Sequence, residues 1–184
     1  MWTLPNILTM MRIAVIPVLV GSFYLDDPIM GSHIAFVTFA LASITDFFDG
    51  YLARRQGSVS KLGQFLDPIA DKLMVGAVII MVVGFDKLNG IHVIPAVIIL
   101  CRELLVSGLR EFLAGSDVTV PVSWVAKWKT TVQMVALTAL TWIPGADAFN
   151  APAYEVGTYG LWIAAALTIY TGFDYLRAGL KHMT

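Results

Sequence analysis

The sequence predicts an all-α, polytopic integral membrane protein with six transmembrane helices and both termini in the cytoplasm. Three observations predict this class. Hydrophobic residues make up 58% of the 184 residues and charged residues only 14%, whereas charged residues form roughly a quarter of an ordinary soluble domain. Six apolar segments approach the ~20 residues that a helix needs to cross a bilayer. Basic residues gather on one side of the resulting topology.

The first three segments are residues 4–25, 33–54 and 68–86. The first lacks the basic start and small-residue cleavage site of a secretory signal, so we expect a retained membrane helix. Asp26-Asp27-Pro28 separates it from the second, and Gln56-Gly57-Ser58 ends the second. For the third, Asp67 suits the N-cap and Pro68 the first helical position.

The last three segments are residues 91–113, 122–143 and 155–176. Turn-forming residues at 86–90, 115–117 and 144–152 separate them. Every connection is short, so neighbouring helices are expected to pack antiparallel. We therefore predict a single membrane domain over residues 1–184.

Charge fixes the orientation of these helices. With six spans, one side or its adjoining helix ends carries Arg54, Arg55, Lys61, Lys72, Lys127, Lys129, Arg177 and Lys181. The opposite loops carry Asp26, Asp27, Asp86, Asp147 and Glu155, with Lys87 as their one basic residue. We expect the protein in the inner cell membrane. Because cytoplasmic loops are rich in Lys and Arg, both termini and the four acids described below are expected on its cytoplasmic side. The net charge of −1 suggests no nucleic-acid partner.

Four carboxylates stand out in DFFDGYLARRQGSVSKLGQFLDPIAD: Asp46, Asp49, Asp67 and Asp71. Acids in membrane segments are costly and usually mark function. Asp46 and Asp49 share one helical face, as do Asp67 and Asp71. Two such faces opposed would form a site of hard oxygen donors, which suits Mg²⁺ or Mn²⁺ and phosphate chemistry. The alternative is that these acids are helix caps and ion-pair partners of nearby basic residues.

Small residues accompany the acids. Gly50 and Ala53 lie on the same stripe as Asp46 and Asp49, and they leave room for a nucleotide against the backbone. Arg54, one position further round, can neutralise its phosphate. Gly63 permits flexibility or a close approach.

These residues carry a family resemblance. The stretch is similar at every fixed position to the signature D-x2-D-G-x2-A-R-x8-G-x3-D-x3-D of the CDP-alcohol phosphotransferases: Asp46, Asp49, Gly50, Ala53, Arg54, Gly63, Asp67 and Asp71. The resemblance implies a homodimeric membrane enzyme in which an acceptor hydroxyl attacks the lipid-proximal phosphorus of a CDP-linked lipid and CMP leaves. It further implies that Asp46, Asp49 and Asp67 hold two divalent cations, and that Asp71 is the base and can also complete the second metal shell.

The acceptor is predicted from two basic stretches. Arg102 and Arg110 lie eight residues apart in CRELLVSGLREF, and Lys127 and Lys129 occur in WVAKWKT. Cations in a membrane site favour an acceptor that carries phosphate. Both stretches, and LPNILT near the start, resemble the phosphatidylglycerophosphate synthases of this family. This implies CDP-diacylglycerol and sn-glycerol 3-phosphate as substrates, with the acceptor phosphate held by Arg102, Arg110 and Lys127.

Several alternatives stay open. Either arginine can instead belong to a salt-bridge network with Glu103 or Glu111, and Lys129 can extend to the interface. Asn6 can approach the nucleotide or cap the first helix, and Thr9 and Arg12 can also approach the nucleotide. Another acceptor would make the chain a cardiolipin or phosphatidylinositol phosphate synthase. A cation transporter would spread its acids across the membrane, and hydrophobicity argues against a soluble isoprenoid synthase.

Overall fold

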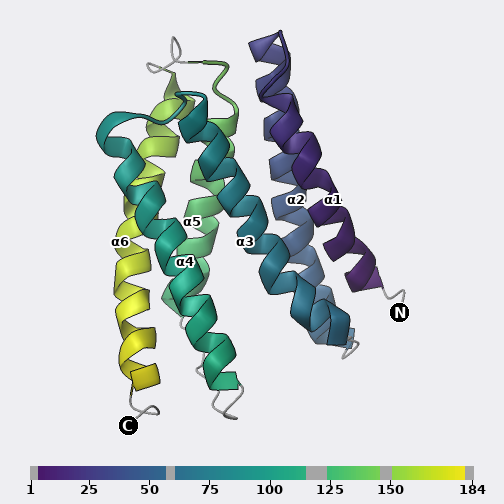
Figure 1. Ribbon diagram of the computed structural model, residues 1–184, viewed down its shortest axis with the longest axis vertical. Helices are drawn as coiled ribbons and strands as arrows, with labels where there is room; N and C mark the ends of the chain where they lie inside the picture. Colours follow the sequence, from purple (N-terminus) through teal and green to yellow (C-terminus); the bar gives the residue numbers. More distant parts are fainter. Residues whose placement is uncertain (1–3, 57–60, 115–123, 146–150, 181–184) are drawn as a thin grey trace.

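Six antiparallel α-helices form the computed structural model, and one 3-10 helix joins two of them (Figure 1). The structure describes residues 4–56, 61–114, 124–145 and 151–180. Within these ranges it leaves out the side chains of residues 4–6, 47–56, 61, 62, 64, 114, 174 and 178–180. The elements are α1 (Leu4–Ser22), α2 (Pro28–Gln56), α3 (Lys61–Gly84), η1 (Gly90–His92), α4 (Val93–Ala114), α5 (Trp124–Thr141) and α6 (Pro152–Leu180).

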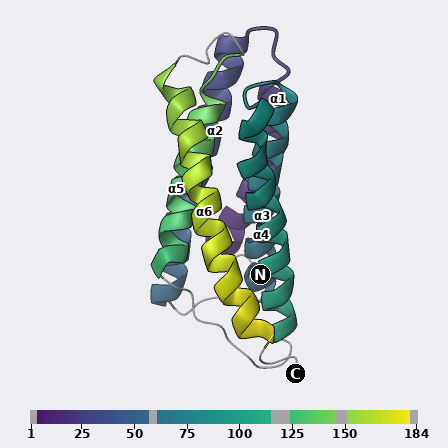
Figure 2. The same cartoon turned by 90° about the vertical axis from the view of Figure 1, so that its left-hand side faces the viewer.

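The helices form two groups of three. In the first group α1 packs against both α2 and α3, and in the second α6 packs against both α4 and α5. The two views show the chain running up and down the bundle, so that α1 begins and α6 ends towards the same end (Figures 1 and 2). Contacts of α3 with α4 and of α2 and α3 with α5 join the groups. A site between the groups therefore draws residues from distant parts of the chain.

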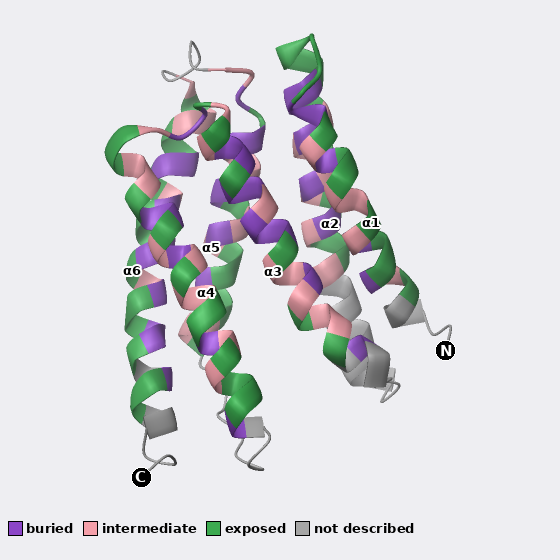
Figure 3. Ribbon diagram, in the orientation of Figure 1, coloured by how far each residue is buried: buried purple, intermediate pink, exposed green. Residues whose placement is uncertain are grey.

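An apolar core runs through both groups (Figure 3). Leu19, Phe39, Val78, Leu137 and Leu161 are almost fully buried in it. In the second group, a Cβ atom added at Gly160 of α6 would lie 2.8 Å from the Cβ of Ala136 of α5. Small residues thus let α5 and α6 pack closely, as is common between membrane helices.

The bundle exposes large apolar side chains on its surface and buries some polar ones. Large apolar side chains such as Leu41, Ile80 and Ile163 are more than half exposed. Arg12 and Gln133, in contrast, are buried. This distribution suits a protein surrounded by lipid, in which polar side chains face the interior of the bundle.

Among the described residues, three stretches are long and apolar enough to cross a membrane: Pro28–Asp46, Gly90–Leu113 and Pro152–Arg177. A shorter apolar helix covers Ile7–Ser22. The predicted all-α class and the six helices are confirmed for the described residues. The predicted start of the third helix is wrong, because α3 begins at Lys61 and contains Pro68. Proline costs a helix one backbone hydrogen bond, and here the helix continues past it.

Candidate active site

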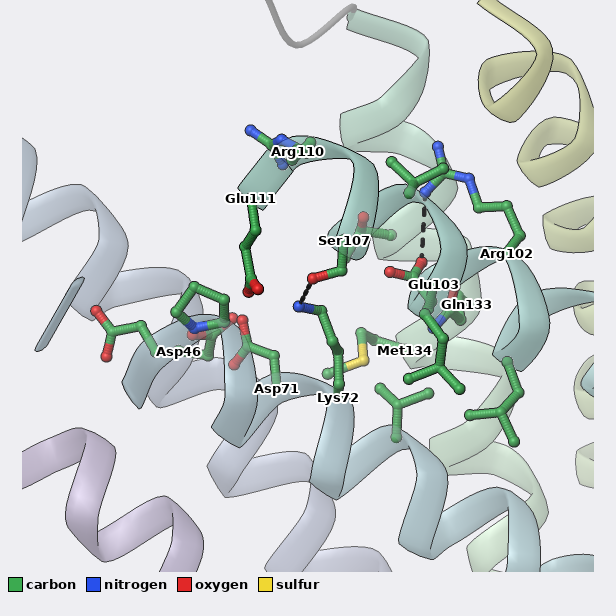
Figure 4. A pocket seen from close by; sticks show the side chains of 17 residues that line it. Asp46, Asp71, Lys72, Arg102, Glu103, Ser107, Arg110, Glu111, Gln133 and Met134 are labelled. Atoms are coloured by element: carbon green, nitrogen blue, oxygen red, sulfur yellow. Dashed lines mark hydrogen bonds and ion pairs between the residues drawn. The ribbon is translucent and has the colours of Figure 1, made fainter. Parts of the chain in front are cut away.

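Three of the four predicted acids line one cavity of about 590 Å³ between α2, α3, α4 and α5 (Figure 4). Asp46 comes from α2, and Asp67 and Asp71 come from α3. The four-residue spacing of Asp67 and Asp71 places them on one face of α3. All three are partly exposed, so their carboxylates are accessible from the cavity. The structure thus brings acids of two helices together.

Helix α1 supplies the polar groups that bind these acids. Arg12 donates through Nη1 to Oδ1 of Asp71 and through Nη2 to Oδ1 of Asp46, each at 2.8 Å. One turn earlier, the Thr9 hydroxyl donates to Oδ1 of Asp67. Since one guanidinium reaches both Asp46 and Asp71, their carboxylates converge closely enough to share a cation.

The opposite wall of the cavity, called the basic wall below, carries both of its arginines. Arg102 and Arg110 line it from α4, together with Glu103 and Glu111. Lys72 of α3 donates to the Ser107 hydroxyl of α4, and Figure 4 shows this pair between Asp71 and the Arg102–Glu103 pair. One cavity therefore combines a carboxylate region with a basic region, which suits a reaction between two phosphate-bearing molecules.

The ring of Tyr175 on α6 lies close to both arginines. The guanidinium carbon of each lies 5.8 Å from the centroid of the Tyr175 ring. Arg102 is half-buried, lies 3.7 Å from Glu103 and donates to the Thr171 hydroxyl at 3.0 Å. Arg110 is exposed. Arg102 is thus anchored in a network, whereas Arg110 is more accessible to a substrate.

The two lysines of α5 have different positions. Lys127 is exposed and is not among the described residues that line the cavity. Lys129 is buried and donates to Glu103, which also pairs with Arg102. Residues two apart on a helix point about 200° apart, so only one of these lysines can face inward. The structure places Lys129, and not Lys127, beside the basic wall.

Gln133, one turn beyond Lys129, is a further polar group of this wall. It lines the cavity and is buried. Its Oε1 atom accepts no hydrogen bond within the described part of the chain. A bound hydroxyl group can therefore find an acceptor here.

Most of the predicted nucleotide site lies outside the described side chains. This applies to Asn6 of α1 and to Asp49, Gly50, Ala53 and Arg54 of α2. Gly63 is buried near the start of α3.

The donor chemistry of the acidic wall fits a hard divalent cation, since Asp46, Asp67 and Asp71 offer carboxylate oxygens from two helices. Among the described residues, no three acidic, histidine or cysteine side chains are grouped closely enough to hold one ion. Arg12 stands where Asp46 and Asp71 converge. The fit therefore rests on ligand type and convergence.

The contacts of Thr9 and Arg12 with the acids were not predicted from the sequence, and neither was the Lys72–Ser107 bond. A signal was present for the first pair. Thr9 and Arg12 are polar, three residues apart and surrounded by apolar residues, so they share a face that must meet polar groups.

Comparison with known proteins identifies the family of this chain. The model of the CDP-alcohol phosphatidyltransferase family matches residues 2–170. Three relatives named CDP-diacylglycerol–glycerol-3-phosphate 3-phosphatidyltransferase are similar over almost their whole length. The Rickettsia bellii protein is 51% identical over 97% of this chain and 96% of its own. For the Haemophilus influenzae protein the values are 41%, 96% and 92%, and for the Cereibacter sphaeroides protein 40%, 99% and 97%. The chain therefore belongs to the CDP-alcohol phosphatidyltransferase family.

Proposed function

We propose that this chain transfers the phosphatidyl group of CDP-diacylglycerol to sn-glycerol 3-phosphate, forming phosphatidylglycerol phosphate and CMP. One observation carries the proposal: a single cavity holds Asp46, Asp67 and Asp71 on one wall and Arg102 and Arg110 on the other. The first wall suits the diphosphate of the donor, and the second suits the phosphate of the acceptor. The names of the relatives specify the same two substrates.

In this proposal the acidic and the basic residues of the cavity have different roles. Asp71 accepts the proton of the acceptor hydroxyl as that oxygen attacks the lipid-proximal phosphorus. Arg102 and Arg110 bind the acceptor phosphate and orient it, which converts a bimolecular encounter into a positioned one. Asp49, Gly50, Ala53, Arg54, Gly63 and Asn6 remain our predicted contacts of the CDP moiety. Lys127, which we predicted as a contact of the acceptor phosphate, is not among the described residues that line the cavity. Lys129 supports the basic wall through its bond to Glu103.

The proposal includes two divalent cations, Mg²⁺ or Mn²⁺. Asp46, Asp49 and Asp67, with Asp71, would hold them. When bound, they neutralise charge on the phosphates and make the nearby hydroxyl more acidic.

The activity test measures CMP release. Purified protein is incubated with CDP-diacylglycerol, Mg²⁺ or Mn²⁺ and one acceptor at a time. Release stimulated by glycerol 3-phosphate supports the proposal. Stimulation by phosphatidylglycerol or inositol phosphate alone would instead identify the other synthases, and cation flux without CMP would identify a transporter.

We further propose that all six helices cross the inner membrane, with both termini and the cavity on the cytoplasmic side. We also propose that two copies of the chain form a homodimer and that membrane lipids surround it. The antiparallel bundle and the charge asymmetry support the topology. The test uses a Cys101→Ser background, since Cys101 is the one cysteine. Single cysteines placed at Asp27 and Asp86 should react with an impermeant maleimide added to spheroplasts, and one at His182 should not. If only the cysteine placed at His182 were labelled, the topology would be the inverse of the proposed one. Cross-linking in the membrane tests the dimer.

A further inference from the structure

We propose that Arg12 is a positioning residue: it holds Asp46 and Asp71 from their buried side, so that they present oxygens to a divalent cation in the cavity. This inference rests on the proposed function, in which these acids bind metal. It assigns α1 a part in the site that the family signature, which begins at Asp46, does not include.

Burial shows on which side of the acids Arg12 lies. Its side chain is 4% exposed, while those of Asp46 and Asp71 are 38% and 47% exposed. The two acids line the cavity, and Arg12 is not among the described residues that line it. The guanidinium therefore contacts the carboxylates from the protein interior, and their accessible parts face the space where substrates bind.

The carboxylates of Asp46 and Asp71 keep oxygen lone pairs with which to bind a metal ion. Arg12 contacts one oxygen, Oδ1, of each acid at 2.8 Å. An ionised carboxylate has two oxygens and about four lone-pair sites, so one charge-assisted bond does not exhaust it. The planar guanidinium fixes the orientation of both carboxylates relative to each other.

Thr9 extends this arrangement. It lies one turn from Arg12 on the same face of α1, and it donates to Asp67. One face of α1 therefore contacts three acids from two other helices. Hydrogen-bonding partners of metal ligands typically change metal affinity by about 10–100-fold.

A competing effect has the opposite sign. The positive charge of Arg12 repels an incoming cation, so a residue that merely occupied the metal position would weaken binding, and its removal would strengthen it. The direction of the change in affinity therefore distinguishes a positioning residue from a competitor.

The experiment measures Mn²⁺ binding to the full chain in detergent, without lipid substrate, by the electron paramagnetic resonance signal of free Mn²⁺. The Arg12→Met variant is expected to bind about 10–100-fold more weakly. Arg12→Lys should recover part of the affinity, because an ammonium keeps the charge but lacks the planar fork. Thr9→Val should weaken binding by a smaller factor.

Lys87→Met is the matched control. Lys87, like Arg12, is a cation with 5% residue exposure, but it lies in the loop after α3, at the other end of that helix from Asp67 and Asp71. Its loss should leave Mn²⁺ affinity unchanged. Unchanged or tighter binding by Arg12→Met, or equal weakening by Lys87→Met, would overturn the inference.

Failure of the proposed function has a separate signature. If the wild-type chain binds no Mn²⁺, or binds it equally well after Asp46→Asn, the metal proposal itself is wrong. Should Arg12→Met not fold, Arg12→Lys and Thr9→Val decide the question: weaker binding by both supports the inference, and wild-type binding by both overturns it.

Discussion

The proposed function assigns its most specific chemical role, that of the base, to Asp71. It lines the cavity and accepts a bond from Arg12. Asp71→Asn preserves size and removes the base, so kcat should fall by at least about 100-fold, while the KM for CDP-diacylglycerol changes less. Initial rates of CMP release measure this. Glu111→Gln is the control, because Glu111 lines the same cavity from α4; an equally large loss there would indicate a general effect of cavity charge.

Arg110 differs from its neighbours by its accessibility. Because it is exposed and lines the cavity, Arg110→Gln should raise the KM for glycerol 3-phosphate by about tenfold or more, as expected for a lost bond to a charged group. The KM for CDP-diacylglycerol should change little. Lys127→Gln, also exposed but outside the cavity, should change neither constant. If Lys127→Gln selectively raised the acceptor KM, the original sequence-based assignment would be correct.

Lys87 links pH to stability. It is buried over the Phe23 ring, and burial lowers the pKa of Lys87 to about 8 from its ordinary 10.5. Below pH 8 the folded chain carries the full cost of the buried charge. Between about pH 8 and 10.5 the unfolded chain binds more protons, so stability should rise with pH. Thermal unfolding in detergent at pH 7 and 9.5 should show this rise in the wild type and a smaller one in Lys87→Met. Equal slopes in both proteins would assign the rise to other groups.

At the scale of the helices, packing between α5 and α6 depends on glycine. A Cβ atom at Gly157 would lie 2.5 Å from Cγ of Leu140, too close for any real contact. Gly157→Ala should therefore destabilise the protein by about 1–3 kcal/mol. Gly21→Ala in α1, where nothing lies within 4 Å, is the control and should be neutral or slightly stabilising. Unfolding midpoints in a denaturing detergent compare the two, and a neutral Gly157→Ala would mean that α6 can shift.

The sequence predicted the helices better than their ends. Apolar length and turn-forming residues located all six helices of the described chain, since these signals are local. The start of α3 was misplaced, because Asp67 and Pro68 form a strong local start signal. That signal did not prevail, and α3 extends back to Lys61. Local preferences do not include the packing that decides such boundaries.

At the scale of the whole molecule, the predicted site was incomplete in a specific way. Spacing identified which residues share a helix face, and so it selected the acids and the two arginines. It did not reveal which helix lies opposite each face. Arg12 reaches Asp46 and Asp71 only because α1 packs on both α2 and α3. Lys129 reaches Glu103 only because α5 lies close to α4 beside the cavity that both helices line.

The three aspartates that line the cavity come from α2 and α3, and both of its arginines come from α4. In the proposed function, this division separates the catalytic step from the recognition of the molecule that receives the lipid. Selectivity can thus be redesigned by altering residues of α4 to α6 alone, while the machinery that cleaves the donor is left intact. An engineer seeking a new headgroup would start beside Tyr175.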